Sequence, residues 1–284
     1  MHKSIFLVVA GLLGCSLTLN LAHAADVKPL RVLLITGGCC HDYAKQKDIL
    51  KHGLEARANV VVDQIHADIP AGTSATKPPL PIYGNPDYAK GYDVVIHDEC
   101  ASDINDPATI KGVLAPHRAG IPGVNLHCGM HCYRIGNPGE PATAGSERAL
   151  WFDYLGLQSS GHGAQLPIAI RFTDKTHALT HGLGDWTTVN EELYNNIQIF
   201  PTARPLAHGT QTMKKKDGAT KEDDYVCAWA NDYRGTRVFS TTIGHNNATV
   251  EDARYLDLVT RGLLWACGKL DDKGNINPGY GPKK

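Results

Sequence analysis

Histidine, cysteine and acidic side chains, the groups that bind metals or move protons near neutral pH, gather at a few places in this 284-residue chain. Three stretches carry most of them: Cys39-Cys40-His41-Asp42, His97-Asp98-Glu99-Cys100 and His127-Cys128-Gly129-Met130-His131-Cys132. Two more histidines, His162 and His245, stand beside glycines, which let a backbone approach a ligand closely. These residues form the candidate site.

Three kinds of chemistry fit these residue types. Neutral imidazoles and a carboxylate suit zinc or another divalent ion, although no H-E-x-x-H or C-x-x-C spacing occurs. A histidine or glutamate suits metal-free acid–base chemistry, and Cys128 lies at an expected strand-to-helix turn where a nucleophile is exposed. For the cysteines we favour disulfides over a reactive thiol, with Cys39-Cys40 bridged to Cys100, Cys128 or Cys132.

The apolar pattern predicts the elements that position these residues. Short apolar runs predict buried strands at residues 31–36, 59–62, 92–97 and 123–127, and helices are predicted at 44–57 and 107–119. With right-handed crossovers, this order predicts an α/β fold with a doubly wound, mostly parallel, flavodoxin-like sheet and helices on both faces. In the strand order 2-1-3-4-5 the three stretches follow neighbouring strands, at the edge where such sheets bind ligands.

The second half of the chain is more mixed. Strands are predicted at residues 166–172, 225–230 and 237–242, followed by an amphipathic helix at 252–268. A loop rich in proline and glycine, at residues 67–91, has the length of a functional lid. We expect one domain at residues 25–270 and a disordered tail at 271–284.

The N-terminus has the pattern of a signal peptide. Lys3 precedes an apolar run at residues 5–21, and Ala22-His23-Ala24 offers a cleavage site. We expect a signal peptide at residues 1–24 and a periplasmic or secreted protein, with a lipoprotein anchored through Cys15 as the alternative. Cleavage removes one of eight cysteines and leaves seven, so at least one thiol stays free or pairs outside the chain.

Composition narrows the partners. The chain is 42% hydrophobic, which is enough for a sizeable core, and its formal net charge is −1. This charge favours neither a nucleic acid nor an anionic membrane surface as the partner. No stretch after the N-terminal run is long and apolar enough to span a bilayer, so we expect no transmembrane span in the mature chain.

Ordered sequence pieces carry a resemblance to a known family. They are Thr36-Gly37-Gly38 with His41-Asp42, Pro122-Gly123-Val124-Asn125-Leu126-His127, Ser160-Gly161-His162-Gly163, Glu191-Glu192-Leu193-Tyr194 and Gly244-His245. With these pieces, residues 30–269 resemble the ThuA-like (trehalose-utilisation) family, whose fold is that of the class I glutamine amidotransferases. The resemblance implies a role in the use of trehalose and related disaccharides, with chemistry on keto-sugars that an oxidoreductase supplies.

The resemblance also implies an enzyme, a hydrolase, lyase or isomerase that acts on a sugar derivative; a non-catalytic sugar-binding protein is the alternative. The expected roles are catalysis by His41, Asp42, His127 and Glu192, substrate binding by Gly38, His162 and Tyr194, and a divalent metal, zinc, at His41, His127, His162 and His245. The cysteines depart from the family pattern and leave the identity of any metal open.

Glutaminase activity is not expected, although the resemblance implies an amidotransferase fold. Leu126 and Met130 replace both glycines of the G-x-C-x-G elbow that this chemistry needs around Cys128. The glutamate expected two residues after the later histidine is also missing, because Asn247 stands there, two residues after His245.

Overall fold

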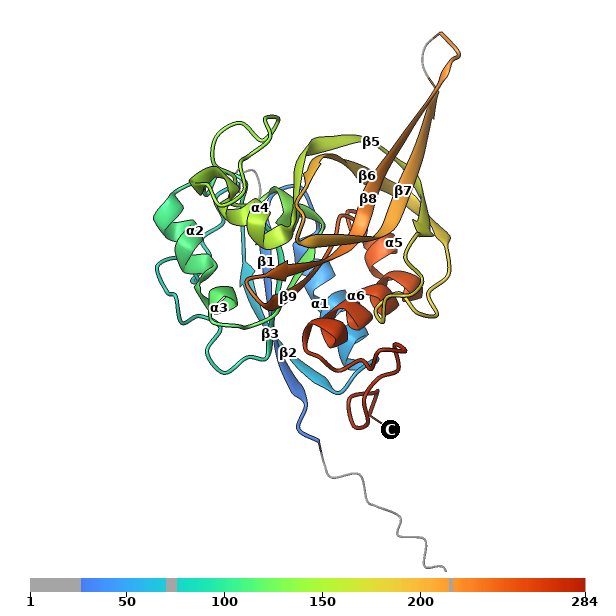
Figure 1. The fold of residues 1–284 in the computed structure, drawn as a ribbon. Coiled ribbons are helices and arrows are strands. Elements are labelled where there is room, and N and C mark those ends of the chain that lie inside the picture. Colours follow the sequence, from blue (N-terminus) through green and yellow to red (C-terminus); the bar gives the residue numbers. More distant parts are fainter. Residues whose placement is uncertain (1–26, 70–75, 215–216, 284) are drawn as a thin grey trace, which may run out of the picture.

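The computed structural model describes residues 27–69, 76–214 and 217–283 (Figure 1). The expected signal peptide, with Cys15, lies outside the described residues. Within the described part, one nine-stranded sheet runs through the molecule, in the order β2-β1-β3-β4-β9-β8-β7-β5-β6. The chain is an α/β protein with a mixed sheet.

One half of the sheet is parallel, as the apolar runs predict. Its strands are β2 (Val60–Ala67), β1 (Leu30–Gly38), β3 (Val94–Cys100), β4 (Gly123–Leu126) and β9 (Thr236–Thr241). All four pairs between these neighbours are parallel, so their carboxyl ends meet at one edge of the sheet, which we call the rim. The predicted order 2-1-3-4 is confirmed for the first four strands, but the fifth position is occupied by β9 and not by the next strand of the chain.

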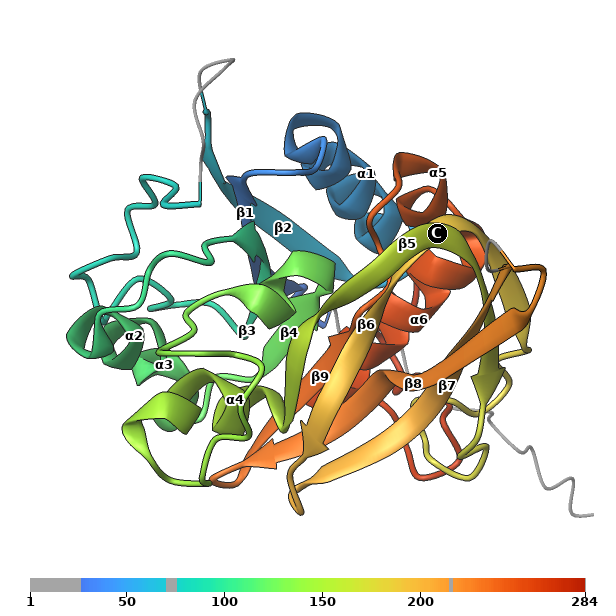
Figure 2. The same cartoon turned by 90° about the horizontal axis from the view of Figure 1, so that it is seen from above.

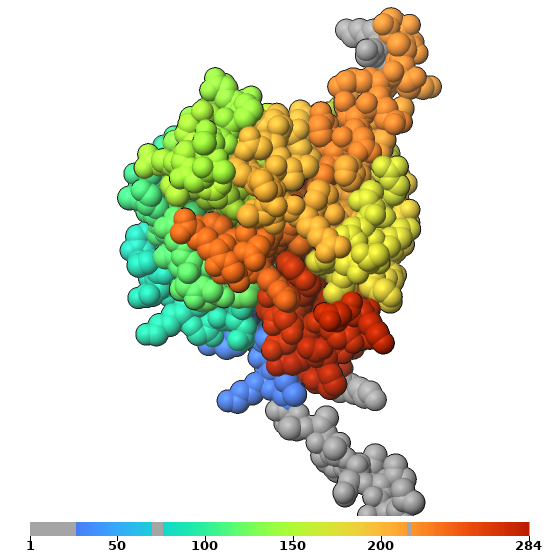
Figure 3. Space-filling view, in the orientation of Figure 1, coloured from blue at the N-terminus to red at the C-terminus, as the bar shows by residue number. Residues whose placement is uncertain are grey.

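The other half is antiparallel, so the prediction of a mostly parallel sheet is wrong. Its strands are β8 (Thr220–Tyr233), β7 (Ala203–Lys214), β5 (Leu157–Phe172) and β6 (Trp186–Ile199). Four further pairs, from β9 to β6, are antiparallel. Polar residues at consecutive positions, such as Asn190, Glu191 and Glu192, hide the strand pattern of β6 in the sequence. The far ends of β7 and β8 project beyond the body of the molecule (Figure 3).

Helices cover both faces of the parallel half (Figure 2). They are α1 (Tyr43–Glu55), α5 (Asn247–Val250) and α6 (Ala253–Ala266) on one face, and α2 (Pro107–Val113), α3 (Ala115–Arg118) and α4 (Leu150–Leu155) on the other. Alternate residues of β1 supply the two cores: Val32 and Leu34 pack in the core of α1 and α6, whereas Leu33 and Ile35 pack in that of α2 and α4. Two 3-10 turns, η1 (His127–His131) and η2 (Glu147–Ala149), complete the set.

Local signals explain the helix boundaries. Asp106 caps α2 by accepting a hydrogen bond from the Thr109 amide at 2.7 Å, and Pro107 occupies the first turn. The helix expected at residues 107–119 is divided into α2 and α3 at Leu114, where Pro116, which lacks an amide hydrogen, begins the next turn. Among the described residues, no helix has the length and apolarity to cross a membrane.

Two segments differ from expectation. Residues 271–283, expected to be disordered, follow a defined path in which Asn59 donates hydrogen bonds to the carbonyls of Gly279 and Tyr280. The described part of the expected lid, residues 76–91, is anchored by Leu80 and Ile82, which are buried in the core beside α2. Small apolar anchors of this kind are hard to recognise in a chain segment dominated by proline, glycine and polar residues.

Candidate active site

Three histidines from three strand ends meet at the rim. His41 follows β1, His127 follows β4 directly and His245 follows β9. Their ring centroids are 4.7 Å apart for His41–His127 and His41–His245, and 5.5 Å for His127–His245. One ring nitrogen of each lies within 4.8 Å of the others. We call these three residues the histidine cluster.

The orientation of His127 is set by the backbone. The residue has a φ of 38°, a conformation that is uncommon outside glycine and that occurs at functional sites. Its Nδ1 donates a hydrogen bond to the carbonyl of Thr242 at 2.7 Å. Because a carbonyl only accepts, the proton of a neutral ring stays on Nδ1, and Nε2 presents its lone pair towards Glu192 and Tyr194.

Glu192, on β6, faces the histidine cluster from the antiparallel half. Its carboxylate oxygens lie 3.4 Å from His127 Nε2, 3.4 Å from His245 Nδ1 and 3.5 Å from His162 Nε2. Burial alone raises the pKa of this carboxyl, but the adjacent side chains of His127 and His245 and the charges of His127 and His162 outweigh burial and lower the pKa well below its ordinary value. Glu192 is therefore an anion held among imidazoles.

His41 is held neutral. Burial, followed by the neighbouring charges of His127 and His245, lowers the pKa of His41 to about 2. Its Nδ1 is buried, and within the described residues it has no hydrogen-bond partner. A neutral imidazole with a free nitrogen is the form of histidine that binds a metal ion.

His245 is positioned by two residues for which the sequence analysis expected no role, Glu191 and Gln165. The buried Glu191 carboxylate accepts hydrogen bonds from the backbone amides of Gly244, His245 and Asn246, at 3.3, 2.9 and 2.9 Å. Gln165 donates to Glu192 Oε1 at 3.1 Å and lies 2.9 Å from His245 Nε2. The close contact with the Glu192 carboxylate raises the pKa of His245 above its ordinary value, against the opposing effect of burial.

A pocket of about 260 Å³ opens beside the cluster. Its lining includes Cys39, Cys40, His41, Thr76, Cys100, Ser102, Cys128, His131, Arg134, His162, Glu192 and Tyr194. His162 sits in a bulged part of β5, opposite Tyr194, and its side chain is 41% exposed. The Tyr194 ring stacks on His131 with centroids 4.0 Å apart, so the wall here is aromatic and polar.

Three further residues expected at the site, Asp42, Gly38 and His97, have distinct surroundings in the structure. Asp42 is exposed, accepts a hydrogen bond from Asn247 at 2.7 Å and lines a separate pocket of about 210 Å³ that also touches His41. Gly38 has a φ of 116°, and a Cβ there would collide with the Cys100 carbonyl, so the glycine is required by strand packing. His97, expected at the rim, is fully buried and lies 2.8 Å from Glu99 on the α2 face, because strand residues alternate between faces.

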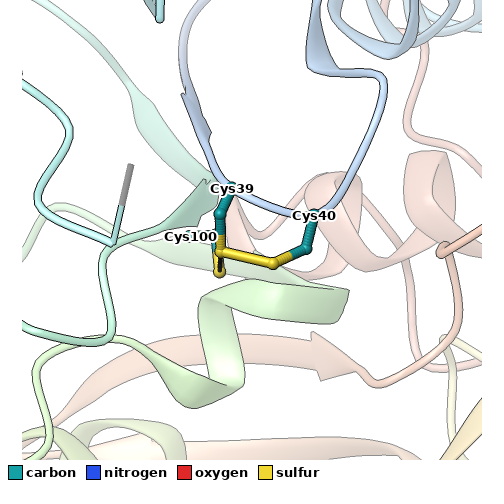
Figure 4. A group of neighbouring side chains, drawn as sticks. All are labelled: Cys39, Cys40 and Cys100. Atoms are coloured by element: carbon teal, nitrogen blue, oxygen red, sulfur yellow. Dashed lines mark hydrogen bonds between the residues drawn. A yellow bond between two sulfur atoms is a disulfide. The ribbon is translucent and has the colours of Figure 1, made fainter. Parts of the chain in front are cut away.

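The rim cysteines form two disulfides, Cys39–Cys40 and Cys100–Cys128 (Figure 4 shows the first, beside Cys100). The Cys100–Cys128 disulfide joins β3 to η1. The Cys39–Cys40 disulfide links adjacent residues, a pairing that was not among the expected bridges. Cys132 is a buried free thiol that donates to the Glu99 carbonyl at 3.0 Å. Cys128, as a disulfide, is not a nucleophile in this state.

Comparison with known proteins identifies the chain. The sequence model of the ThuA family, described as trehalose utilisation, matches residues 31–266. Two solved structures described as ThuA-like are similar in fold: one from Parabacteroides merdae has 20% identity and a TM-score of 0.60, covering 90% of this chain and 98% of that one. The other, from Bacteroides uniformis, has 15% identity and a TM-score of 0.56, covering 84% and 92%.

A third solved structure is less similar, and the comparison with curated sequences finds no match. A structure described as a GMP synthase component from Thermoplasma acidophilum has 10% identity and a TM-score of 0.48, covering 85% of this chain and 96% of that one. No curated protein sequence matches the chain. The family model spans the strands that carry all three histidines of the cluster, and the chain belongs to the ThuA family.

Proposed function

We propose that this protein is an enzyme of carbohydrate utilisation whose substrate is a disaccharide or its keto-sugar derivative. The observation that carries the proposal is the convergence of His41, His127 and His245 around the Glu192 anion, beside a pocket lined by polar groups. Titratable groups with shifted pKa values in a pocket are typical of catalytic sites. The trehalose-utilisation family supports a sugar as the substrate.

We further propose that the histidine cluster holds a divalent metal ion, with zinc the best match to three imidazoles. The residues fit: His127 presents Nε2 because Nδ1 is bound to Thr242, and the buried Nδ1 of His41 has no partner within the described residues. Such a metal polarises a carbonyl or activates a water. Glu192 balances the charge and lies 3.4 Å from both His127 and His245, so it helps to fix the positions of the two rings.

The remaining pocket residues bind the sugar in this proposal. His162 and Arg134 line the pocket from opposite segments and offer donors for hydroxyl or carbonyl oxygens. Burial lowers the pKa of Arg134, but a guanidinium stays charged at physiological pH, so it supplies a cation in the pocket. Tyr194 contributes a hydroxyl 3.3 Å from His127 Nε2, in position to bind a substrate oxygen at the cluster.

A metal-free acid–base site is the alternative that a specific contact favours. The Glu192–His245 pair raises the pKa of His245, which brings this imidazole towards the range in which it exchanges protons at neutral pH. In that case His245 moves the proton and Glu192 stabilises the imidazolium, while His41 and His127 bind the sugar directly.

Elemental analysis separates the two mechanisms. Protein purified without a histidine tag is expected to carry about one zinc per chain, and the His41→Ala, His127→Ala double variant none. His52→Ala, an exposed histidine on α1, is the matched control and should keep the metal. Full turnover of a disaccharide or keto-sugar after exhaustive chelation refutes the metal; saturable binding without turnover supports a sugar-binding protein instead.

The proposal includes export and a supplying enzyme. Cleavage after Ala24 makes Ala25 the first residue of the mature protein, which N-terminal sequencing tests; a lipid on Cys15 would instead identify a lipoprotein. An oxidoreductase that makes the keto-sugar is the proposed pathway partner. If the enzyme does not turn over the untreated disaccharide but does turn over the sugar after it has been oxidised, this enzyme acts after the oxidation step.

A further inference from the structure

Four cysteines stand together in the lining of the pocket: Cys39, Cys40, Cys100 and Cys128, which we call the cysteine cluster. Besides the two disulfides, the Sγ atoms of Cys39 and Cys100 are 3.5 Å apart. Figure 4 shows Cys100 beside the Cys39–Cys40 disulfide. The two disulfides differ in exposure: Cys40 is exposed and Cys39 half-buried, whereas Cys100 and Cys128 are only 4% and 7% exposed. Solvent therefore reaches the first disulfide far more readily than the second.

We propose that the cysteine cluster is a thiol–disulfide exchange site that accepts two electrons from a dithiol and delivers a free thiol to Cys128 in the pocket. Three observations support this: the difference in exposure between the two disulfides, the contact of Cys39 with Cys100, and the place of Cys128 in the lining of the pocket beside Glu192. Exchange between a thiolate and a disulfide needs such a contact, because it proceeds by direct attack on sulfur.

The exchange balances in atoms and electrons. One sulfur of the dithiol, as the thiolate, attacks Cys40 and breaks the Cys39–Cys40 bond, which leaves Cys39 as a thiolate. Cys39 attacks Cys100, forming Cys39–Cys100 and releasing Cys128 as a thiolate. The second sulfur of the dithiol attacks the first, so the dithiol leaves as a disulfide and Cys40 is released. The two protons of the dithiol pass to Cys40 and Cys128; the dithiol is oxidised and the protein gains one pair of electrons.

The exchange stops at Cys128 for a structural reason. Cys132, the next sulfur, is fully buried, forms no disulfide in the described chain and donates its one S–H to the carbonyl of Glu99, with the Cys128 carbonyl 3.4 Å away. Burial raises the pKa of Cys132 well above its ordinary value, so it is a thiol and a poor nucleophile.

The exchange also changes which segments are tied together. Before it, a disulfide holds η1 to β3, and the loop after β1 has no covalent link to its neighbours. Afterwards Cys39–Cys100 holds that loop to β3, and η1 is released. Cys40 precedes His41 and Cys128 follows His127, so both cross-links act next to the histidine cluster. The redox state of the cysteine cluster would thus adjust the spacing of two proposed ligands.

Two matched serine variants test the proposal without any reductant. In Cys40→Ser the thiol of Cys39 has no partner, and it is expected to attack Cys100, so peptide mapping after alkylation should find Cys39 joined to Cys100 and a labelled Cys128. In Cys39→Ser the thiol of Cys40 remains, and Cys100–Cys128 should stay intact. Cys267→Ser, a free cysteine outside the cluster, should keep the wild-type pairing.

The wild-type protein supplies the second measurement. One equivalent of dithiothreitol should give label on Cys40 and Cys128 and a Cys39–Cys100 cross-link, and a reduced C-x-x-C protein run in parallel shows which dithiol source reacts faster. Label confined to Cys39 and Cys40 overturns the proposal, as does a Cys40→Ser variant that keeps Cys100–Cys128. Four free thiols binding a metal in the protein as isolated would also overturn it.

Discussion

Replacing Glu191 by glutamine is expected to destabilise the fold and loosen His245 together. The Glu191 carboxylate is fully buried and accepts three backbone amides at the start of α5. Glutamine has a similar shape, but it keeps a single acceptor oxygen and turns an NH₂ group towards donors. One charged hydrogen bond exceeds a neutral one by about 1 kcal/mol, so three bonds give a loss of about 3 kcal/mol in the free energy of unfolding.

Urea unfolding followed by circular dichroism measures this loss directly. For a chain of this size, about 3 kcal/mol corresponds to a fall in Tm of roughly 6–12 °C. Glu222→Gln, an exposed residue on β8, is the matched control and should change the free energy of unfolding by less than about 0.5 kcal/mol.

Metal affinity gives the second readout for Glu191. Partners that orient a metal ligand contribute about 10- to 100-fold to affinity, so zinc binding by Glu191→Gln should weaken by that factor if the cluster holds the ion. An unfolding free energy within about 0.5 kcal/mol of wild type would refute the reasoning, because it would mean that the three amides do not depend on the carboxylate charge.

Three further predictions concern packing, the buried network and pH. Gly262→Ala should lower the free energy of unfolding by about 1–3 kcal/mol, because its Cβ would overlap an aromatic ring of β9, whereas Gly112→Ala, with open space, should raise it by about 0.5–1 kcal/mol; urea titrations compare the two. Tyr133→Phe removes a hydrogen bond of 2.6 Å to the buried Glu99 carboxylate and should cost about 1.5–3 kcal/mol in the same assay. In metal-free folded protein, His41 stays neutral down to about pH 2, whereas in the unfolded chain it takes up a proton below its ordinary pKa of 6.5. Its contribution to the free energy of unfolding is therefore present above pH 6.5 and is lost as the pH falls. His41→Gln should flatten this pH dependence, and an unchanged slope in urea titrations from pH 7.5 to 4.5 would contradict the prediction.

The sequence predicts the parallel half of the sheet well, because continuous apolar runs such as that of β1 occur where both faces of a strand are buried. The antiparallel half is harder to predict, since β6 is solvated on parts of both faces and its pattern is broken by bulges opposite β5. The sequence pattern therefore predicts no element at residues 186–199, where β6 forms.

The candidate site divides in the same way. The positions of His41 and His127 at the site can be predicted, because both follow parallel strands whose carboxyl ends meet at one edge of the sheet. Glu192, His162 and Tyr194 come from the antiparallel half; flanking glycines drew attention to His162, and only the family resemblance pointed to Glu192 and Tyr194. Gln165 had no signal at all, since an isolated glutamine becomes meaningful only when pairing of β5 with β6 sets it beside Glu192.

The place of β9 has a consequence for how the protein is made. It is the last strand in the chain, yet it lies at the middle of the sheet, between β4 and β8. Until β9 has been synthesised, β4 and β8 are unpaired edge strands of the two halves of the sheet, and unpaired edge strands can pair with other chains. The candidate site contains residues from both halves of the sheet, so it can form only after residues 236–245 have folded into place. A chain that stops before β9 is expected to aggregate, and folding of the whole protein depends on its last quarter.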